Sequence, residues 1–508
     1  SFSFASVPRG ASVRGLMEAP SRDVGPLLAS QPARGCLDPA HPAFRYAVLF
    51  CSCMLTFGSY FCFDMPSTMK EPLQDQYIRP WAPTTGLFQT DFLYGLYYSL
   101  YAWTNALVGS IFGGVIVDRY GTHFSTLLFC SLYLAGQIVF AIGASLDGLG
   151  AEAQYGVMVL GRFVFGMGGG AITLVQNTIS AQYFVHDRMA LAMGFTLTAS
   201  RMGSVINLNV TASLVKATSI SAVLWIGVGL CAAGASFGFA YIALDRRHSA
   251  YLASQGQESS GVAVKKVSLR DISQLPPRLW ILSCIISLYY IGIFAFIAVA
   301  KDFFQAKWHG DEAVSDGAAF RSSVVYLMSM VFTVFVGAFV DSVGNRARIM
   351  FGTCLLSIPC FLLFQLTTLD PVCGMLLLGV TYMFAASSMW PCIPLVVPKH
   401  LVGTANGVAT SVQMIGIALA NMLVGSLQDA SPETYPGTKV KTYTYCMAFF
   451  AGCASVASLL SLVINCMDSR SGGELNRRKT QVPPPPTPQR NSLGVSLEPT
   501  PGEEEGGL

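Results

Sequence analysis

The chain has 508 residues, of which 52 % are hydrophobic and only 12 % are charged. Soluble globular proteins carry about 25 % charged residues, so the composition excludes a typical soluble protein and predicts that most of the chain faces lipid or other apolar helices. The net charge of +3 is too small to indicate binding to nucleic acid.

Residues 1–43 are expected to form a disordered cytosolic tail, because they are polar and contain several prolines. They hold no short apolar core, so no cleavable signal peptide is expected. Within this tail, Asp23, Leu27 and Leu28 fit the pattern acidic-x-x-x-Leu-Leu. Adaptor proteins read such signals when they sort cargo to endosomes and lysosomes, although a chance pair of leucines is an alternative.

Twelve apolar runs follow, and each is long enough, at about 20 residues, to cross a bilayer as a helix. They form two groups of six and predict an all-α membrane protein of twelve transmembrane helices, with six-helix bundles at 44–244 and 278–465. The runs lie at 44–63, 92–117, 123–145, 154–180, 189–213, 221–244, 279–300, 319–340, 348–368, 372–397, 403–428 and 442–465.

Basic residues predict the orientation of these helices. The connections on one side, including a polar linker at 245–277, hold most of the lysine and arginine, whereas the loops on the other side are rich in acidic residues. Because basic loops stay in the cytosol, both termini are predicted to be cytosolic. Residues 466–508 read as a second disordered tail with a proline-rich stretch at 483–486, and a plain solvated tail is favoured over an SH3-type ligand.

One turn occurs twice, at corresponding places in the two groups of runs, which is typical of secondary transporters built from two bundles. Its residues are Gly114, Asp118, Arg119 and Gly121 in the first copy and Gly337, Asp341 and Gly344 in the second. The glycines are expected to let helices approach closely, and the aspartate to accept from a helix N-terminus or a basic side chain. The turn is therefore interpreted as a conformational hinge. Its spacing resembles the signature turn of the major facilitator superfamily.

Arg201 is the main candidate for substrate binding. It lies in the middle of the fifth run, where a charge costs about 2.5–3.5 kcal/mol on insertion scales. The related run of the second half has Met414 at the equivalent place, between glycines that match in both halves. A residue needed only for packing would be apolar in both halves. We therefore predict that Arg201 faces a central cavity and binds a carboxylate, for which its planar guanidinium is well shaped.

Arg162, in the fourth run, is followed by spaced glycines, a pattern that resembles a second motif of the same superfamily. It shares one helix face with Gln176, and Asn177 lies beside that face. This face is interpreted either as a cavity wall that binds substrate or as the site of a structural arginine that ties helices together through carbonyl groups.

Aromatic and amide side chains complete the predicted substrate-binding set, with core packing or an interfacial belt as the alternative. They are Tyr60, Tyr98, Asn105, Tyr289, Tyr290 and Trp390. Lys301 and Asp302 end the seventh run, where a solvated helix end is favoured over a gate. No nucleophile–base pair or metal cluster is recognisable, so we expect neither an enzyme nor a bound cofactor or metal.

Seven strings spread over the membrane region and the linker resemble a lysosomal branch of the superfamily. They lie at 57–64, 161–166, 176–178, 245–247, 269–272, 390–391 and 403–405. The resemblance implies a lysosomal uniporter that exports dipeptides, with an N-terminal dileucine signal. It also implies a heavily glycosylated accessory subunit, the glycosylated lysosomal membrane protein. In agreement, the one Asn-x-Ser/Thr site, at Asn209, lies inside a membrane run and is not expected to carry a protective glycan.

The chain departs from this branch at one place. The resemblance implies an acidic residue after the glycines of the fourth helix, which would meet the substrate's amino group, but this chain has Gly170 there. The predicted function is export of dipeptides, or of a related small carboxylate-bearing solute, by alternating access. The alternatives are a proton-coupled carrier of another organic anion and a non-transporting nutrient sensor or scaffold.

Overall fold

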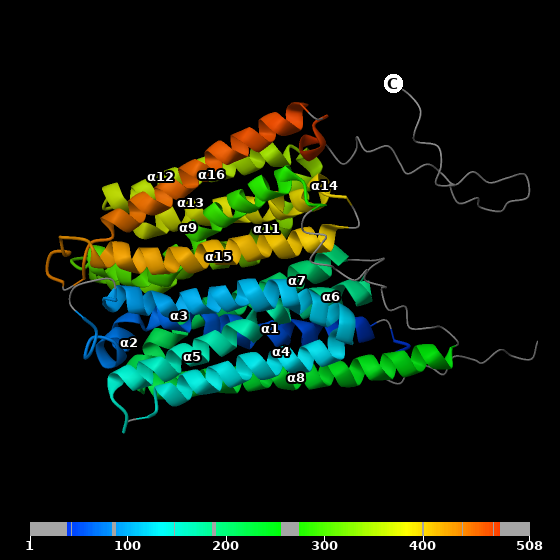
Figure 1. The fold of residues 1–508 in the computed structure, drawn as a ribbon, viewed down its shortest axis with the longest axis horizontal. Helices are drawn as coiled ribbons and strands as arrows, with labels where there is room; N and C mark the ends of the chain where they lie inside the picture. The colour runs from blue at the N-terminus through cyan, green and yellow to red at the C-terminus, as the bar shows by residue number, and fades with distance from the viewer. Residues whose placement is uncertain are drawn as a thin grey trace, which may run out of the picture.

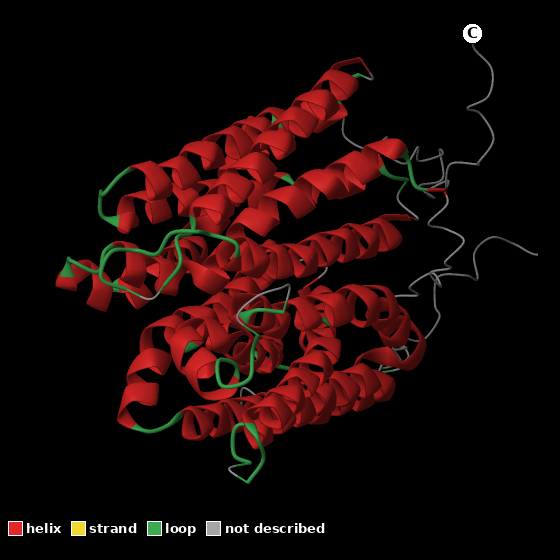
Figure 2. Cartoon of the chain, turned by 60° about the vertical axis from the view of Figure 1, so that its left-hand side comes forward, coloured by secondary structure: helices red, strands yellow, loops and turns green. Residues whose placement is uncertain are grey.

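The computed structural model describes residues 38–41, 43–83, 88–146, 148–184, 189–255, 274–398, 401–438, 440–470 and 472–477. The described chain is almost entirely helical (Figure 1, Figure 2). By length and composition, ten of the described helices are apolar enough to cross a membrane. The segment formed by α3 and η1, and helix α7, run beside the other helices of the first bundle (Figure 1).

The first bundle holds the blue to green helices in the lower half of Figure 1. They are α1 (Phe44–Thr68), α2 (Lys70–Tyr77), α3 (Thr90–Thr104), the π-helix η1 (Asn105–Phe112), α4 (Gly113–Gly143), α5 (Ala151–Gly169), α6 (Ala171–Phe184), α7 (Met189–Ala217) and α8 (Ile220–Ser254). Helix α8 runs ten residues past the predicted end of its span, into the predicted linker. Asp245 holds it there, because its carboxylate pairs with His123 at 2.7 Å and accepts from the Tyr183 hydroxyl at 2.5 Å.

The second bundle holds the green to red helices of the upper half of Figure 1. They are α9 (Pro277–Lys307), α10 (Glu312–Asp316), α11 (Ala318–Val343), α12 (Arg346–Leu366), α13 (Pro371–Ser388), the 3-10 helix η3 (Trp390–Cys392), α14 (Ile393–Val396), α15 (Val402–Asp429), α16 (Thr444–Arg470) and the 3-10 helix η5 (Glu474–Asn476). The predicted tail from residue 466 thus begins too early. Leu475 of η5 is buried, and Asn476 bonds to Asp468 of α16.

The repeated turn has the same backbone feature in both halves. Gly121 bends α4 with a φ of 78°, and Gly344 ends α11 with a φ of 68°, a region that favours glycine because it has no Cβ. The expected close approach is not found at the first glycine of the first copy, since a Cβ added to Gly114 would meet no atom within 4 Å. The glycine that ends each copy of the turn, Gly121 or Gly344, therefore explains the repeat better than the glycine that begins it.

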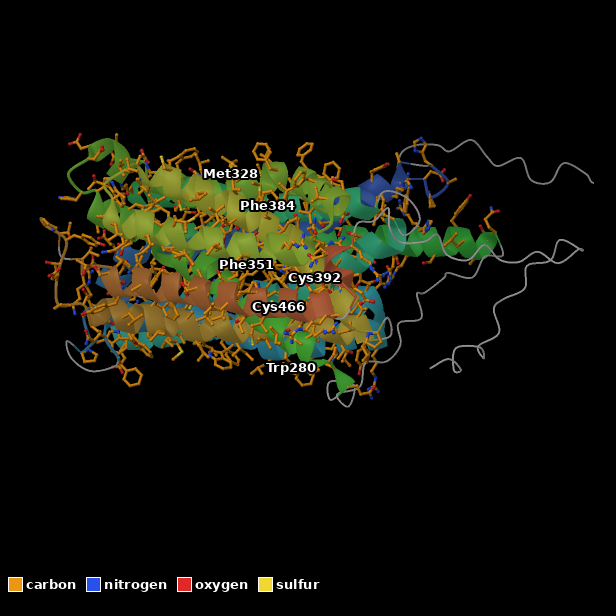
Figure 3. The ribbon with its side chains drawn as sticks, turned by 90° about the horizontal axis from the view of Figure 1, so that it is seen from above. Trp280, Met328, Phe351, Phe384, Cys392 and Cys466 are labelled. Atoms are coloured by element: carbon orange, nitrogen blue, oxygen red, sulfur yellow. The ribbon has the colours of Figure 1, made fainter. Side chains whose placement is uncertain are left out.

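The two bundles meet along two pairs of helices, α3 against α15 and α7 against α11. We call the end of the molecule that carries α2 the α2 end (Figure 1). Many large apolar side chains are exposed on the outside of both bundles, for example Phe239 of α8 and Phe335 of α11. Figure 3 shows side chains projecting from the outer faces of the second bundle, as a lipid-facing surface requires.

Candidate functional site

A cavity of about 450 Å³ lies between the bundles, within the range of small-molecule sites of about 300–1,000 Å³. Helices α1, α3, η1, α6 and α7 line it from one side, and α9, α11, α13, η3 and α15 from the other. Seven of the ten predicted substrate-binding residues lie in its wall. They are Tyr60, Tyr98, Asn105, Asn177, Arg201, Tyr290 and Trp390.

Arg201 lies in the wall of this cavity, held by aromatic rings. Its Nη2 donates to the Tyr382 hydroxyl, and its guanidinium carbon lies 5.1 to 5.8 Å from the ring centres of Tyr60, Phe294, Tyr326 and Tyr382. No carboxylate among the described residues forms an ion pair with it, and its Nε has no hydrogen-bond partner in that part of the chain. The buried Nε thus keeps a free donor, and the side chain to which it belongs lines an open volume.

Arg162 plays a different structural part. Its side chain is fully buried and absent from the cavity wall. Its Nε, Nη1 and Nη2 donate to the carbonyl oxygens of Tyr97, Cys62 and Phe63 at 3.0, 3.1 and 3.1 Å. Of the two readings that the sequence left open, this geometry is that of a structural arginine, which ties α5 to α1 and α3.

Gln176 and Tyr289 also lie outside the cavity wall. Gln176 donates to the Ser52 carbonyl and to the Thr56 hydroxyl of α1, both at 3.0 Å. The Tyr289 hydroxyl donates to Thr381 of α13 at 3.0 Å. Both side chains join helices within one bundle, which is a structural role.

The sequence reasoning missed most polar residues that the second bundle contributes. Thr410, Gln413 and Asn421 of α15 line the cavity, together with Tyr382 of α13. The first three recur at helical spacing on one face of the eleventh run, which is a signal that could have found them. No sequence pattern distinguishes Tyr382 from other aromatic residues of its helix.

Met414 lines the cavity as well, so the positions that the repeat pairs with each other face the same space. Behind the wall, Asp64 of α1 is 2 % exposed, and its Oδ2 has no hydrogen-bond partner among the described residues. It interacts electrostatically with Arg201 and Arg162. Asp64 is the acidic group next to both arginines.

The predicted hinge residues behave unequally. In the second copy, Arg346 donates to Asp341 at 2.7 Å, so the aspartate accepts from a basic side chain of the next helix, as predicted. In the first copy, the side chain of Asp118 lies outside the described part of the chain, and the guanidinium of Arg119 lies 5.5 Å from the ring centre of its neighbour Tyr120. The predicted sorting residues Asp23, Leu27 and Leu28 also fall outside the described residues.

A buried polar cluster joins the bundles at the α2 end, and we call it the polar lock. At its centre, Lys70 lies between two acids, with its Nζ 2.9 Å from Asp91 Oδ1 and 3.1 Å from Asp302 Oδ2. It also donates to Gln428 at 3.0 Å and to the Tyr443 hydroxyl at 2.9 Å. Lys70 and Asp91 come from the first bundle and the other three from the second. The expectation of a solvated helix end is wrong for Asp302, which is 6 % exposed.

Two further contacts strengthen the lock. Asp429 at the end of α15 accepts from the backbone N–H of Phe92 at 2.9 Å, and thus satisfies a free amide at the start of α3. Glycine brings the same helices close together, because a Cβ added to Gly95 of α3 would lie 2.5 Å from the Asn421 carbonyl oxygen. A Cβ added to Gly425 of α15 would overlap the Asp91 carbonyl.

The lock separates the cavity from a second hollow at the α2 end. That hollow has a volume of about 390 Å³ and shares none of its lining residues with the cavity. Between them lies a void of about 10 Å³ beside Lys70 and Gly95. A water molecule needs at least about 10–15 Å³, so this void has room for at most about one water molecule.

Charge stabilises the lock in spite of its burial. Burial alone would lower the pKa of Lys70, but the carboxylates of Asp302 and Asp91 outweigh it and raise this pKa above its ordinary value. The lysine therefore stays charged in the closed lock, and each acid has a partner.

Comparison with known proteins agrees with this two-bundle cavity. A family model described as Major Facilitator Superfamily matches residues 48–421. The chain belongs to the major facilitator superfamily. Among solved structures, the xylose transporter XylE from E. coli, in a partially occluded inward-open conformation, has a TM-score of 0.62 at 14 % identity and covers 83 % of this chain and 99 % of its own. The POT family transporter PepTSo has a TM-score of 0.60 at 13 % identity, over 84 % and 98 %.

Curated relatives confirm the resemblance to a lysosomal branch of this superfamily. The protein named lysosomal dipeptide transporter MFSD1 from Bos taurus is 32 % identical over 470 residues, which cover 90 % of this chain and 93 % of that one. Its namesake from Homo sapiens is also 32 % identical, over 86 % and 90 % of the two chains.

Proposed function

We propose that this member of the superfamily carries dipeptides, or related small carboxylate-bearing solutes, from the lysosome to the cytosol by alternating access. It would act as a uniporter with the cavity as its binding site. The observation that carries this proposal is Arg201, a guanidinium in the cavity wall that forms no ion pair among the described residues. A buried cation is costly unless it is paired, and a substrate carboxylate would supply the partner.

The polar lock indicates which side of the membrane the described conformation is closed to. With both termini in the cytosol, as the basic residues predict, the α2 end faces the lumen. The described conformation is then closed to the lumen, and the lock must break before a lumenal solute reaches Arg201. The names of the curated relatives support the class of substrate and the lysosomal membrane.

Uptake by purified protein in proteoliposomes tests the role of Arg201. Arg201→Met introduces the residue found at the equivalent position of the second half. It removes charged hydrogen bonds worth about 1.5–3 kcal/mol, or roughly 10- to 100-fold in affinity. Arg201→Lys keeps the positive charge but lacks the planar group with two parallel donors, so its uptake should lie between those of the wild type and Arg201→Met. Arg79→Met, which removes an exposed cation of the α2 end, is the control. Wild-type uptake by Arg201→Met would reject the proposal.

One observation favours the proton-coupled alternative. Asp64 is a buried carboxylate with an unpaired oxygen, next to the arginine that would hold the substrate. If it takes up a proton during transport, a pH gradient would drive uptake against a substrate gradient. A uniporter would only equilibrate the substrate, so concentrative uptake separates the two mechanisms.

Location and partners complete the proposal. Adaptor proteins would read the dileucine signal of the N-terminal tail, and a glycosylated accessory subunit would shield the lumenal face. The second idea gains support from Asn209, whose side-chain amide donates to Val205 and Ser323 within the helix packing and is not available to a glycan. Replacing Leu27 and Leu28 by alanine should move the protein from lysosomes to the cell surface.

A further inference from the structure

The charge of the cavity wall points to a narrower class of substrate. We infer that the protein prefers solutes with one negative charge, in which the amino group is absent or blocked as an amide, over zwitterionic dipeptides. N-acylated amino acids and N-acylated dipeptides belong to this class. The inference rests on the proposed function, because it takes the cavity as the transport site and Arg201 as the carboxylate contact.

The charges that face the cavity have a single sign. Among the described residues that line it, Arg201 is the one charged residue, and the wall contains no aspartate, glutamate, lysine or histidine. The other polar groups of the wall are hydroxyls and carboxamides, for example Asn105, Asn177 and Gln413. The wall thus offers one cation for a carboxylate and no anion for an ammonium.

An ammonium group placed in this cavity would carry a free-energy cost. A charged group taken out of water needs an opposite charge with additional hydrogen bonds, and neutral carbonyl groups compensate it only in part. A substrate with a free amino group would meet these carboxamides alone. A substrate whose nitrogen is acylated carries a neutral amide instead, which carboxamides can satisfy as donors and acceptors.

Aromatic faces do not replace the missing anion. Rings can bind cations, but the rings that line the wall, except those of Tyr290 and Trp390, already lie beside guanidinium groups. Arg201 stacks on Tyr60, Phe294 and Tyr382. Arg162 lies 5.6 Å from the ring centre of Tyr98, which lines the cavity from the other side. An ammonium on these rings would share each of them with a fixed positive charge.

Asp64 does not reverse this balance. It is buried behind the wall, and it faces two arginines at once, so the three charged side chains together remain positive. The potential in the cavity therefore favours an anion over a zwitterion.

Gly170 shows that the absence of an acid is built into the wall. A Cβ added to Gly170 would overlap the carboxamide of Asn105, which fills the space that a side chain at this position would need. Asn105 begins the π-helix η1 and is 5 % exposed. An acidic side chain at position 170 would fit only if Asn105 were made smaller, which gives a pair of test variants.

The first experiment compares three matched ligands, Ala-Ala, N-acetyl-Ala-Ala and Ala-Ala-amide. Binding to the purified full-length protein is measured first, and flux in proteoliposomes with the membrane potential clamped follows. We expect N-acetyl-Ala-Ala to bind at least about tenfold more tightly than Ala-Ala, a difference of ~1.4 kcal/mol. Equal or tighter binding of Ala-Ala, with both acids ahead of the amide, would overturn the inference and leave the proposed function standing. If the amide binds as well as the acids, or none of the three binds, the proposed function fails and the inference with it.

The second experiment adds the missing charge. Asn105→Ala combined with Gly170→Glu places a carboxylate in the wall, and Asn105→Ala combined with Gly170→Gln is the neutral control of the same size. Thermal unfolding first establishes that both variants are folded. We expect the glutamate variant to prefer Ala-Ala over N-acetyl-Ala-Ala, and the glutamine variant to keep the wild-type order. An unchanged order in the folded glutamate variant would contradict the inference.

Discussion

Replacing Lys70 by methionine is expected to open the α2 end of the protein. Lys70 has 3 % of its side chain exposed and contacts two acids, an amide and a hydroxyl within 3.1 Å. Methionine keeps the length of the side chain but leaves the buried Asp302 and the partly buried Asp91 without their cation. Removing one partner of a buried pair costs about 3–5 kcal/mol, and this cost falls on the closed state, since the open state exposes the same groups to water. At 1.4 kcal/mol per tenfold, the ratio of open to closed protein should rise by about 10²- to 4 × 10³-fold.

A cysteine at position 421 reports this opening. Asn421 lines the cavity and also touches the small void below the lock. A membrane-impermeant maleimide applied from the α2 side should label Asn421→Cys slowly in the parent protein and much faster with Lys70→Met. The exposed thiol of Cys373 is removed first, as Cys373→Ser.

The matched control is Arg79→Met. Arg79 is a cation at the same end of the chain, but its pair with Asp75 is exposed, and such pairs contribute about 0–1 kcal/mol. If Lys70→Met labels no faster than Arg79→Met, the cluster does not hold the bundles together and the reasoning is wrong.

Three further predictions concern Gly95, Lys70 and Arg162. Gly95→Leu should also open the α2 end, because its Cβ would lie 2.5 Å from the Asn421 carbonyl oxygen, and the same labelling assay measures it; labelling at the parent rate would show that α3 and α15 tolerate the added bulk. The contribution of Lys70 should be constant between pH 6 and 8. Burial lowers the pKa of Lys70, but the neighbouring carboxylates raise it by more, so this pKa is higher in the closed lock than its ordinary value. The stabilisation by Lys70 is therefore complete below the ordinary lysine pKa and is lost only as the pH rises through the higher value. A labelling difference between Lys70→Met and its parent that shrinks toward pH 8 would contradict this sign. Arg162→Ala should lower the free energy of unfolding by about 3 kcal/mol or more, since it leaves three buried carbonyl groups without their donor; an unchanged melting temperature would exclude the structural role.

The periodic part of the architecture could be predicted from the sequence. Long apolar runs report helices that lie in lipid, and the repeat at Gly121 and Gly344 reports two related halves, because only glycine adopts the backbone of these turns at low cost. The cavity contact of Arg201 could be predicted by comparing the two halves. Its counterpart Met414 faces the same space, so the asymmetry between the halves was informative.

The features that could not be predicted from the sequence depend on contacts between segments that lie far apart along the chain. Lys70 follows α1 directly and reads as an ordinary loop lysine, since its partners Asp302, Gln428 and Tyr443 lie more than 200 residues away. Arg162 has the same residue type and environment as Arg201 in a hydropathy profile. Only its three carbonyl partners distinguish a structural cation from one that faces the cavity.

The three bonds of Arg162 have a mechanical consequence. They fasten α5 to backbone atoms of α1 and α3, and a backbone carbonyl cannot swing away as a side chain can. Helices α1, α3 and α5 must then move as one rigid body, with little rearrangement inside the first bundle. A compound that binds between α1 and α5 would have to break the hydrogen bonds of Arg162. A compound that binds between α3 and α15 would instead act on the interface along which the two bundles can move.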